Sequence, residues 1–327
     1  MTTLTSLFCG PLAPALTAFM ERMRMTGASH VSLVKTLRRL DRYVAQQHPT
    51  ATTLTQPIVS DWCATFSHLR ATSQRRYRCT ISKLCAFLRS RDPATVSVRP
   101  LPPPLWKSQP FLPCILSTGQ IADLLTRARA VPGSARNALR GESLYLALVL
   151  LYTAGLRIGE VVRLDVSDVD AAVGTLLIRE TKFAKTRLVP LSPSTQRAVA
   201  AYLRERQARA IATHAQTSLL WNPGRRRLCI GTLEHQLCAL FREAGLKPPT
   251  GRVGPRPHDL RHAFAAHRVL AWYRAGDDLG PRLPWLSTYL GHRDLASTQH
   301  YLKVLPGVLE QASDRFAQRR APWGVRP

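Results

Sequence analysis

The chain has 327 residues, of which 45% are hydrophobic, and it carries 46 Lys and Arg against 20 Asp and Glu, a formal net charge of +26. One core rarely grows beyond about 250 residues, so this length predicts two domains, and the apolar content excludes a disordered chain. Such an excess of positive charge is typical of proteins that bind a polyanion, most often nucleic acid. Only seven of the 46 basic residues are lysines, so a solvated basic surface with a codon bias towards arginine is the alternative.

The seven cysteines form an odd set without a Cys-x-x-Cys pair, which favours reduced thiols in a cytoplasm over a disulfide framework or a zinc site. No signal peptide is expected, because the basic residues Arg22 and Arg24 follow the apolar N-terminal stretch instead of preceding it. The longest uncharged apolar run, residues 143–156, is shorter than the ~20 residues that a membrane span needs. We therefore expect a cytoplasmic protein without a membrane partner, in which this run is a buried helix.

Residues 11–90 are predicted to fold into four helical segments. Between 29 and 47, apolar residues recur at steps of three and four with basic residues on the other face, and 73–91 repeats this pattern. Thr55 is a candidate N-cap for a helix through Leu69, with Pro57 in its first turn. These segments predict a small bundle whose cationic face could follow a phosphate backbone; an ordinary solvated bundle is the alternative.

A proline-rich stretch separates the two predicted domains. Six prolines between residues 100 and 113 exclude a helix and favour an extended, stiff connector. We therefore place an N-terminal domain at 1–97, the linker at 98–113 and a second domain at 114–327.

The second domain is predicted to be mainly helical with a small β-sheet. Ser117 and Gln120 have the spacing of a capping box for a helix to about Ala130. An apolar helix at 144–153 precedes the break at Gly155, and short β-type runs then flank a six-residue turn. The β-type runs are 174–180 and 187–191, and the further helices are expected at 192–212, 233–244, 260–272 and 308–320.

Six side chains of this domain form a set that suits a phosphodiester. A guanidinium offers a planar fork of donors that matches two phosphate oxygens, and an imidazole can donate to the same oxygens or move a proton near neutral pH. A tyrosine hydroxyl is among the few side chains that can form a covalent intermediate. The six are Arg157 in the stretch 154–160, Lys182, His258 and Arg261 in His-Asp-Leu-Arg-His at 258–262, His292 after Leu290-Gly291, and Tyr301.

In this order and spacing the motifs resemble those of the tyrosine recombinases, the family of the phage integrases and the Xer proteins. The shared signature is an arginine in Gly-Leu-Arg-x-x-Glu, then His-x-Leu-Arg-His, Leu-Gly-His and a tyrosine nine residues on. The resemblance covers roughly residues 114–310, including a likeness of 182–191 to the family's lysine hairpin. The segment between Arg261 and His292 is several residues longer than usual, which is similar to a transposon-borne branch.

The resemblance implies a fold and a role for each site residue. The fold would be an N-terminal helical core-binding (SAM-like) domain, for which 11–95 has weaker motifs, plus a C-terminal tyrosine-recombinase catalytic domain. Tyr301 would attack the scissile phosphate and leave a 3′-phosphotyrosyl bond, and Lys182 would be the general acid, with Lys185 as its rival. Glu160 is expected to orient the Arg157 guanidinium. The remaining phosphate ligands would be Arg157, Arg261, His258 and His292.

The resemblance also implies partners. The protein would act on double-stranded DNA as a homotetramer on two sites, alone or with a related recombinase, and exchange strands through a Holliday junction in integration, excision, resolution or transposition. The tail helix 308–320 would pack on a neighbouring subunit; packing on its own domain is the alternative. No cofactor is expected, and no metal, because Arg261 would repel a cation from His258, His262 and His292.

Two other functions remain as alternatives at this point. A type IB topoisomerase uses the same covalent chemistry without pairing two sites, and its product would be relaxed plasmid alone. A non-catalytic DNA-binding protein would form no covalent adduct with DNA. The complete set of six residues favours a recombinase over both.

Overall fold

The computed structural model describes residues 7–26, 31–99, 113–135, 137–179, 186–223, 227–251, 253–292 and Thr298. Its described residues form two compact units, one within 7–99 and the other from 113 onwards. Most of the proline-rich linker predicted at 98–113 and the tail helix predicted at 308–320 lie outside the described residues.

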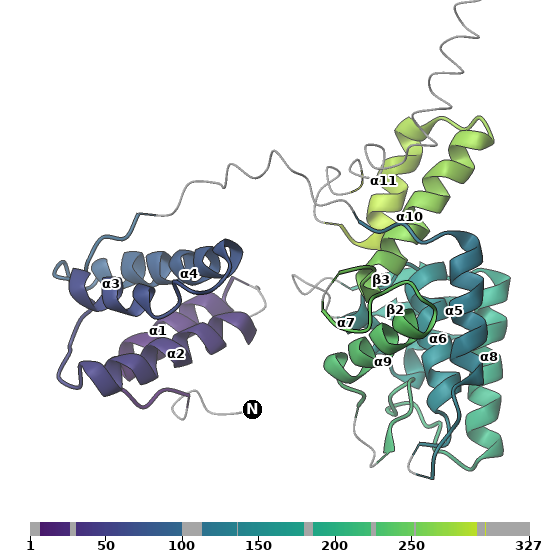
Figure 1. The fold of residues 1–327 in the computed structure, drawn as a ribbon, viewed down its shortest axis with the longest axis horizontal. Helices are drawn as coiled ribbons and strands as arrows, with labels where there is room; N and C mark the ends of the chain where they lie inside the picture. The colour runs from purple at the N-terminus through teal and green to yellow at the C-terminus, as the bar shows by residue number, and fades with distance from the viewer. Residues whose placement is uncertain are drawn as a thin grey trace, which may run out of the picture. The chain divides into compact units, whose positions relative to one another are not determined.

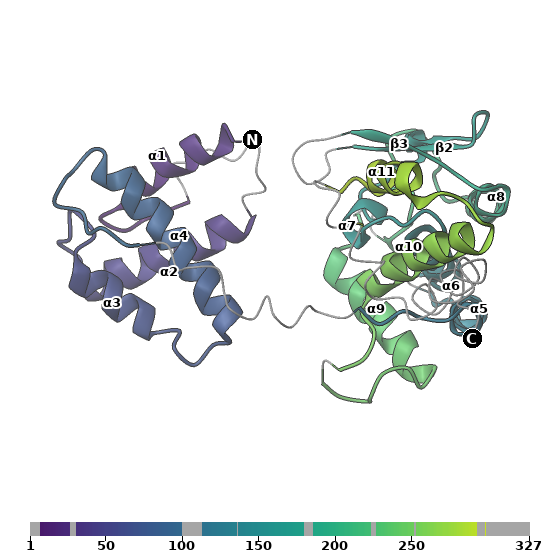
Figure 2. The ribbon, with the colours of Figure 1, turned by 90° about the horizontal axis from the view of Figure 1, so that it is seen from above.

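The N-terminal unit is a helical bundle, as its sequence predicts. Leu37 and Leu40 of the second helix, Trp62 of the third and Leu84 of the fourth are buried in one core. The amphipathic spacing places these apolar residues on the inner faces, so burial and periodicity agree. The helices are α1 (Ala13–Arg24), α2 (Val31–Gln47), α3 (Gln56–Ala64) and α4 (Ala71–Arg89) (Figures 1 and 2).

Helix α3 is shorter than the segment 55–69 that the sequence predicts. It ends at Ala64, and the side-chain amide of Gln74 donates to the carbonyl oxygens of Ser67 (2.7 Å) and Leu69 (2.8 Å), which holds the following turn. Thr55 occupies the predicted N-cap position, but its side chain makes no capping hydrogen bond. At the end of the helix, the hydroxyl of Thr65 donates to the carbonyl of Trp62 over 2.7 Å.

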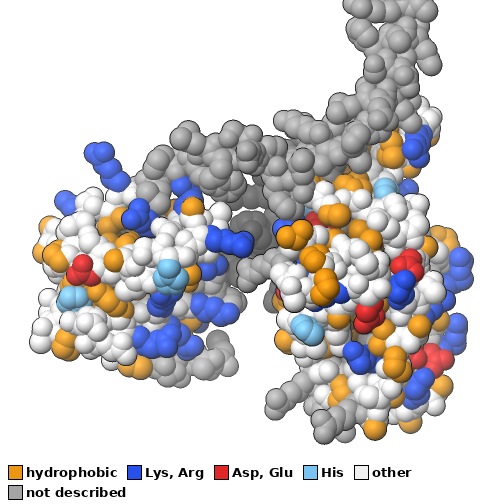
Figure 3. Space-filling model, in the orientation of Figure 1, with side chains coloured by type: hydrophobic (Ala, Val, Ile, Leu, Met, Phe, Trp, Pro, Cys, Tyr) orange, Lys and Arg blue, Asp and Glu red, His pale blue; other side chains and the backbone are white. Residues whose placement is uncertain are grey.

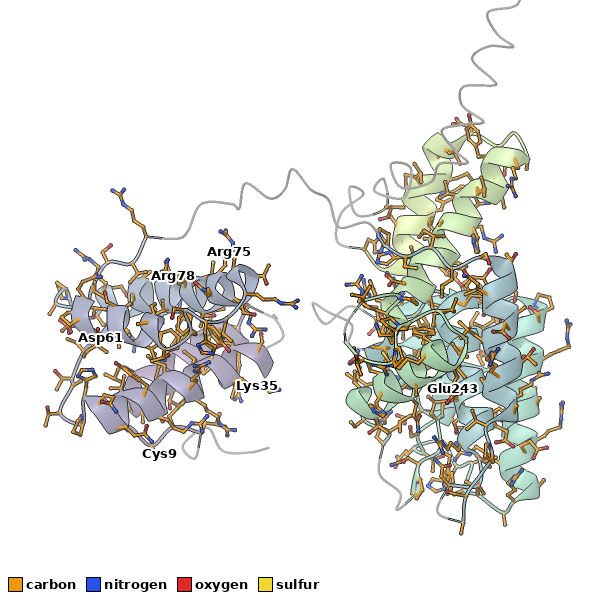
Figure 4. All side chains as sticks on the ribbon, viewed as in Figure 1. Cys9, Lys35, Asp61, Arg75, Arg78 and Glu243 are labelled. Carbon is orange, nitrogen blue, oxygen red and sulfur yellow. The ribbon has the colours of Figure 1, made fainter. Side chains whose placement is uncertain are left out.

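Basic side chains cover the outer faces of α2 and α4. Figure 4 shows Lys35 on α2, and Arg75 and Arg78 projecting from α4. On the face seen in Figure 3, blue side chains of Lys and Arg far outnumber red side chains on this unit. The exposed basic residues of the two helices are Lys35, Arg38, Arg42, Arg76, Arg78, Lys83 and Arg89.

The C-terminal unit is built around α6 (Arg140–Thr153), which is buried on most of its surface. It packs against α5 (Thr118–Ala130), α8 (Pro193–Ala208) and α10 (Pro257–Arg274). The run 143–156 is therefore a buried helix, as predicted, and within the described ranges no helix is long and apolar enough to span a membrane. The capping box of Ser117 and Gln120 is present at the start of α5. The unit also contains α7 (Ile158–Val161), α9 (Ile230–Glu243) and a short 3-10 helix, Val166–Asp168.

A small antiparallel sheet follows α7. In the described part of the chain its strand order is β1-β2-β3, with Leu176 opposite Val189 and Leu177 opposite Leu188. The two predicted β-type runs are strands, although each is shorter than expected, and β1 is an additional strand. The strands are β1 (Val169–Asp170), β2 (Thr175–Ile178) and β3 (Arg187–Pro190).

Helix α11 (Leu279–Leu290) is absent from the sequence predictions, which treat this part only as a longer segment with two prolines. Pro281 lies in the first turn, where a backbone N–H has no partner within the helix. Pro284 lies inside the helix, at a cost of about 3 kcal/mol relative to alanine. The helix forms because Leu283, Leu286 and Leu290 are buried against α10, beside which it lies (Figures 1 and 2).

Candidate active site

Arg157 begins α7 directly after the turn that ends α6. Its Nη1 donates to Glu160 Oε1 over 2.8 Å and its backbone N–H to Oε2 over 2.9 Å, which confirms that Glu160 orients this guanidinium. Nη2 donates to the carbonyl of Gly291 over 2.8 Å. Gly155 allows this approach: its φ is +59°, and a Cβ there would lie 2.7 Å from atoms of both Phe264 and Leu290.

Arg261 lies on α10 and is 1% exposed. Its Nη1 donates to the carbonyl of Gly155 over 2.7 Å, and its Nη2 to the carbonyl of Leu290 over 2.6 Å. The start of α10 is fixed by Asp259, which is buried and accepts the backbone N–H of Arg256 over 2.8 Å. His258 and His262 are four residues apart on one face of this helix, with ring centroids 4.6 Å apart.

Three arginines donate to three successive carbonyls at the C-terminal end of α11. Arg187 Nε reaches Tyr289 over 3.0 Å, and Arg261 and Arg157 reach the next two carbonyls, Leu290 and Gly291. These carbonyls have no partner within the helix and carry its negative dipole end, so guanidiniums are favoured there. Gly291, with φ +66°, ends the helix, and His292 follows it. The motif residues therefore meet at one helix end.

His292 is a neutral imidazole beside two cations. Burial and then the charges of Arg261 and Arg157 lower its pKa to about 3. Its Nδ1 lies 2.7 Å from Oγ1 of Thr298, whose side chain is buried. With the hydroxyl as donor, the ring keeps its proton on Nε2, which is the tautomer that can donate to a phosphate oxygen.

His258 and His262 are also held neutral. Partial burial and the charges of Arg261 and Arg157 lower the pKa of His258 to about 4. Because His258 keeps an exposed surface, we attribute this lower pKa mainly to the two guanidiniums. Burial and the His258 ring lower the pKa of His262 to about 4. Near pH 7 both rings are therefore uncharged, and each can donate or accept a hydrogen bond.

The lowered pKa of His292 predicts a loss of stability in mild acid. Below pH 6.5 the His292 imidazole binds a proton in the unfolded chain, whereas in the folded chain it stays neutral down to about pH 3. The free energy of unfolding therefore falls as the pH falls through this range. Between pH 6.5 and 4.5 we expect His292 to account for about 2 kcal/mol of this fall. Calorimetric unfolding of His292→Gln should show a weaker pH dependence than wild type. His235→Gln, on the exposed face of α9, is the control. If the pH dependence of unfolding weakens equally in both variants, His292 is not the group responsible for it.

Two of the six predicted site residues, Lys182 and Tyr301, lie outside the described residues, as does Lys185. The other four, Arg157, His258, Arg261 and His292, are brought together from α7, α10 and the end of α11. In the described ranges no group of three or more His, Cys, Asp or Glu side chains is placed to hold a metal ion.

Sequence analysis missed Arg187, Asp259 and Thr298. Arg187 at the start of β3 donates Nη1 and Nη2 to the Glu160 carboxylate over 3.1 and 3.0 Å, across 27 residues of sequence. No local pattern indicates that pairing. The capping role of Asp259 could have been predicted, because this residue stands at the third helical position after Arg256 and next to a motif histidine.

Comparison with known proteins gives consistent matches. Residues 116–307 match the phage integrase family. The tyrosine recombinase XerD of Rhizobium meliloti (strain 1021) is 31% identical over 305 residues, which cover 88% of this chain and 90% of XerD. The putative integrase/recombinase y4rB of Sinorhizobium fredii is 39% identical over 208 residues, 63% of this chain. The chain spans 66% of y4rB and 64% of the similar protein y4rE, slightly under two thirds of each.

Solved structures share the fold. The XerH site-specific recombinase in a post-cleavage complex with its difH substrate superposes with a TM-score of 0.61 at 19% identity, over 87% of this chain and 80% of that one. The Tn1549 transposon integrase in complex with transposon right end DNA gives 0.60 at 15% identity, over 93% and 99%. These matches confirm the predicted fold class, mainly helical with a small sheet in an integrase-type catalytic domain.

Proposed function

This chain belongs to the phage integrase family, and on that basis we propose that it is a site-specific DNA recombinase. It cleaves and rejoins DNA through a 3′-phosphotyrosyl intermediate and exchanges strands through a Holliday junction. The observation that carries the proposal is the convergence of Arg157, Arg261, His258 and His292 at the end of α11. Two guanidiniums beside neutral imidazoles suit a phosphodiester, which gains negative charge on its oxygens in the transition state.

The arginines and histidines have different tasks in this proposal. Arg157, whose side chain is 29% exposed, and the buried Arg261 stabilise the charge on the non-bridging oxygens. His292 donates Nε2–H to one of these oxygens. The pKa of His258, lowered to about 4, keeps this ring unprotonated, so it has a nitrogen lone pair that can accept the proton of the attacking phenol.

Tyr301 is the proposed nucleophile and Lys182 the proposed general acid. The phenolate oxygen bonds to phosphorus in line with the departing 5′-oxygen, and Lys182 protonates that oxygen. In the sequence, Lys182 and Lys185 lie between the paired strands β2 and β3, so either lysine is a candidate for this role. Rejoining reverses these steps and needs no cofactor, because the phosphotyrosyl bond conserves the energy of the broken bond.

We assign the two units to the two tasks of such an enzyme. Residues 1–97 form a core-binding domain whose basic helices α2 and α4 contact the phosphate backbone, and the catalytic domain spans 114–327, with 98–113 as linker and a C-terminal tail helix. The active assembly is a homotetramer on two DNA sites, alone or with a related recombinase, in the cytoplasm. The Tn1549 match favours a role in transposition. The λ integrase tetramer bound to a Holliday junction is an assembly of the same fold, with a TM-score of 0.59.

Covalent capture tests this function. Wild-type protein is incubated with sheared genomic DNA of the source organism that has been nicked at random, so that cleavage close to a nick releases a short fragment and traps the protein on DNA. We expect adducts that survive denaturation and that map, by sequencing, to one or a few sites. Tyr301→Phe should bind the same DNA but give no adduct, because it lacks the attacking hydroxyl.

The outcomes separate the alternatives. Adducts at many unrelated sites, with plasmid relaxation but no recombinants between paired sites, would favour a type IB topoisomerase. Absence of any adduct with wild type would favour a non-catalytic DNA-binding protein. An adduct that persists in Tyr301→Phe would refute the nucleophile while leaving the enzyme class in place.

A further inference from the structure

The carboxylate of Glu160 lies between two guanidiniums and is only 1% exposed. It accepts four hydrogen bonds: two from Arg157, through its backbone N–H and Nη1, and two from Arg187, through Nη1 and Nη2. Burial alone would raise the pKa of Glu160, but the hydrogen bonds and charges of Arg187 and Arg157 lower it to about 2. The carboxylate is therefore ionised at any working pH and fixes both arginines.

Arg187 uses all three of its guanidinium nitrogens on protein acceptors. Besides its two bonds to Glu160, its Nε donates to the carbonyl of Tyr289 over 3.0 Å, and its side chain is 13% exposed. Its Nη1 would lie 3.0 Å from a Cβ at Gly291, so it packs tightly against the residue before His292. This guanidinium thus connects three elements: β3, α7 and the end of α11.

We propose that Arg187 is a positioning residue of the recombination reaction, which sets Arg157 and His292 in register for the same phosphate. Through Glu160 it fixes the guanidinium of Arg157, and through the end of α11 it fixes the position from which His292 extends. It touches no reacting atom itself. The inference rests on the proposed recombinase function and adds a residue to which neither the sequence motifs nor the comparisons give a role.

The chain offers a matched control in Asp168 and Arg179. Like Glu160, Asp168 is buried and accepts a backbone N–H three residues before it, from Asp165 over 2.9 Å. Like Arg187, Arg179 lies on the β2–β3 hairpin and forms an ion pair with that carboxylate, with Nε 2.7 Å from Oδ1. The described contacts of this second pair do not include α11 or a motif residue. Although the side chain of Arg179 is 54% exposed, its loss reports the effect of removing an arginine from a buried carboxylate beside the same sheet.

Single-turnover adduct formation on a nicked duplex of the mapped site tests the proposal. Arg187→Ala should slow adduct formation about 100-fold, the size expected for a displacement of about 1 Å at a reacting centre, with the DNA dissociation constant within about threefold of wild type. Arg187→Lys keeps the charge but cannot reach Glu160 and Tyr289 together, so it should still be about 10-fold slow. Arg179→Ala should stay within about threefold of wild type. Each variant is measured well below its own unfolding temperature.

Two modified duplexes identify what Arg187 acts through. A methylphosphonate at the scissile position removes one anionic oxygen and with it much of the need for Arg157, so the deficit of Arg187→Ala should shrink at least 10-fold on this substrate. A sulfur in place of the bridging 5′-oxygen leaves without protonation, so it should rescue Lys182→Ala but leave the Arg187→Ala deficit unchanged.

The proposal is overturned if Arg187→Ala cleaves within threefold of wild type, if Arg179→Ala is equally slow, or if sulfur rescues Arg187→Ala, which would place its effect on the hairpin lysine. A failure of the proposed function looks different: wild-type protein itself then gives no adduct on any duplex, and both ideas fall together.

Discussion

Replacing Arg157 with alanine is expected to slow DNA cleavage about 1000-fold, within the range measured for the loss of one arginine or oxyanion donor from a transition-state site. DNA affinity should change less than about threefold, because one phosphate contact among many contributes little to binding. The reason is the position of this guanidinium: Glu160 and the Gly291 carbonyl fix it, yet its side chain keeps 29% exposure through which a phosphate can be reached.

Two constants are measured on the same duplex: the single-turnover rate of adduct formation and the DNA dissociation constant from gel shifts. Arg163→Ala is the control, since this arginine is exposed and follows α7 directly; both of its constants should stay within about threefold of wild type. If affinity falls as far as cleavage in Arg157→Ala, the residue is a general phosphate contact. We prefer Arg157 to Arg261 for this test, because Arg261 is 1% exposed and binds two carbonyls, those of Gly155 and Leu290, whereas the side chain of Arg157 is 29% exposed and binds one, that of Gly291.

Replacing Glu160 with alanine is expected to destabilise the C-terminal unit by about 3–5 kcal/mol, the usual cost of removing one partner from a buried charge cluster. Two guanidiniums and the backbone N–H of Arg157 lose their shared acceptor in this variant. Glu160→Gln, which keeps the shape but not the charge, should cost less. In wild type this stabilisation is complete above about pH 4.5 and is lost as the pH falls towards 2, because the folded pKa is lowered to about 2.

Hydrogen exchange of the α6 amides measures this effect, since α6 is the buried centre of the unit and its slowest amides report the unfolding free energy. Glu205→Ala is the control: Glu205 and Arg209 form an exposed pair at 3.5 Å, so its removal should cost under about 0.5 kcal/mol. If Glu160→Ala protects the α6 amides as well as this control does, Glu160 is not the anchor of the arginine cluster.

The sequence predicted most of what local patterns determine. The amphipathic helices α2 and α4 and the apolar helix α6 were found within a few residues of their ends, as was the capping box of Ser117. The motif spacing nominated Arg157, His258, Arg261 and His292, which the fold brings together. Even the orienting role of Glu160 followed from its position one turn after Arg157.

What the sequence could not predict depends on partners far along the chain. Helix α11 contains Pro281 and Pro284, which argue locally against a helix, and it forms because tertiary burial outweighs that preference. The pairing of Arg187 with Glu160 joins a strand to a helix over 27 residues, so no spacing rule reveals it. Similarly, Gln74 of the following helix holds the turn after α3 by hydrogen bonds to Ser67 and Leu69.

The carbonyls of Tyr289 and Leu290 lie at different positions around the axis of α11, because each helical residue turns the chain by about 100° and advances it by about 1.5 Å, and the carbonyl of Gly291 follows where the chain leaves the helix. Arg187, Arg261 and Arg157, each bonded to its own carbonyl, therefore prevent both rotation of α11 about its axis and sliding along it. A rigid-body shift of α11 that moves His292 would therefore break all three bonds together. The enzyme is thus expected to pass between competent and incompetent states abruptly, with few molecules in between.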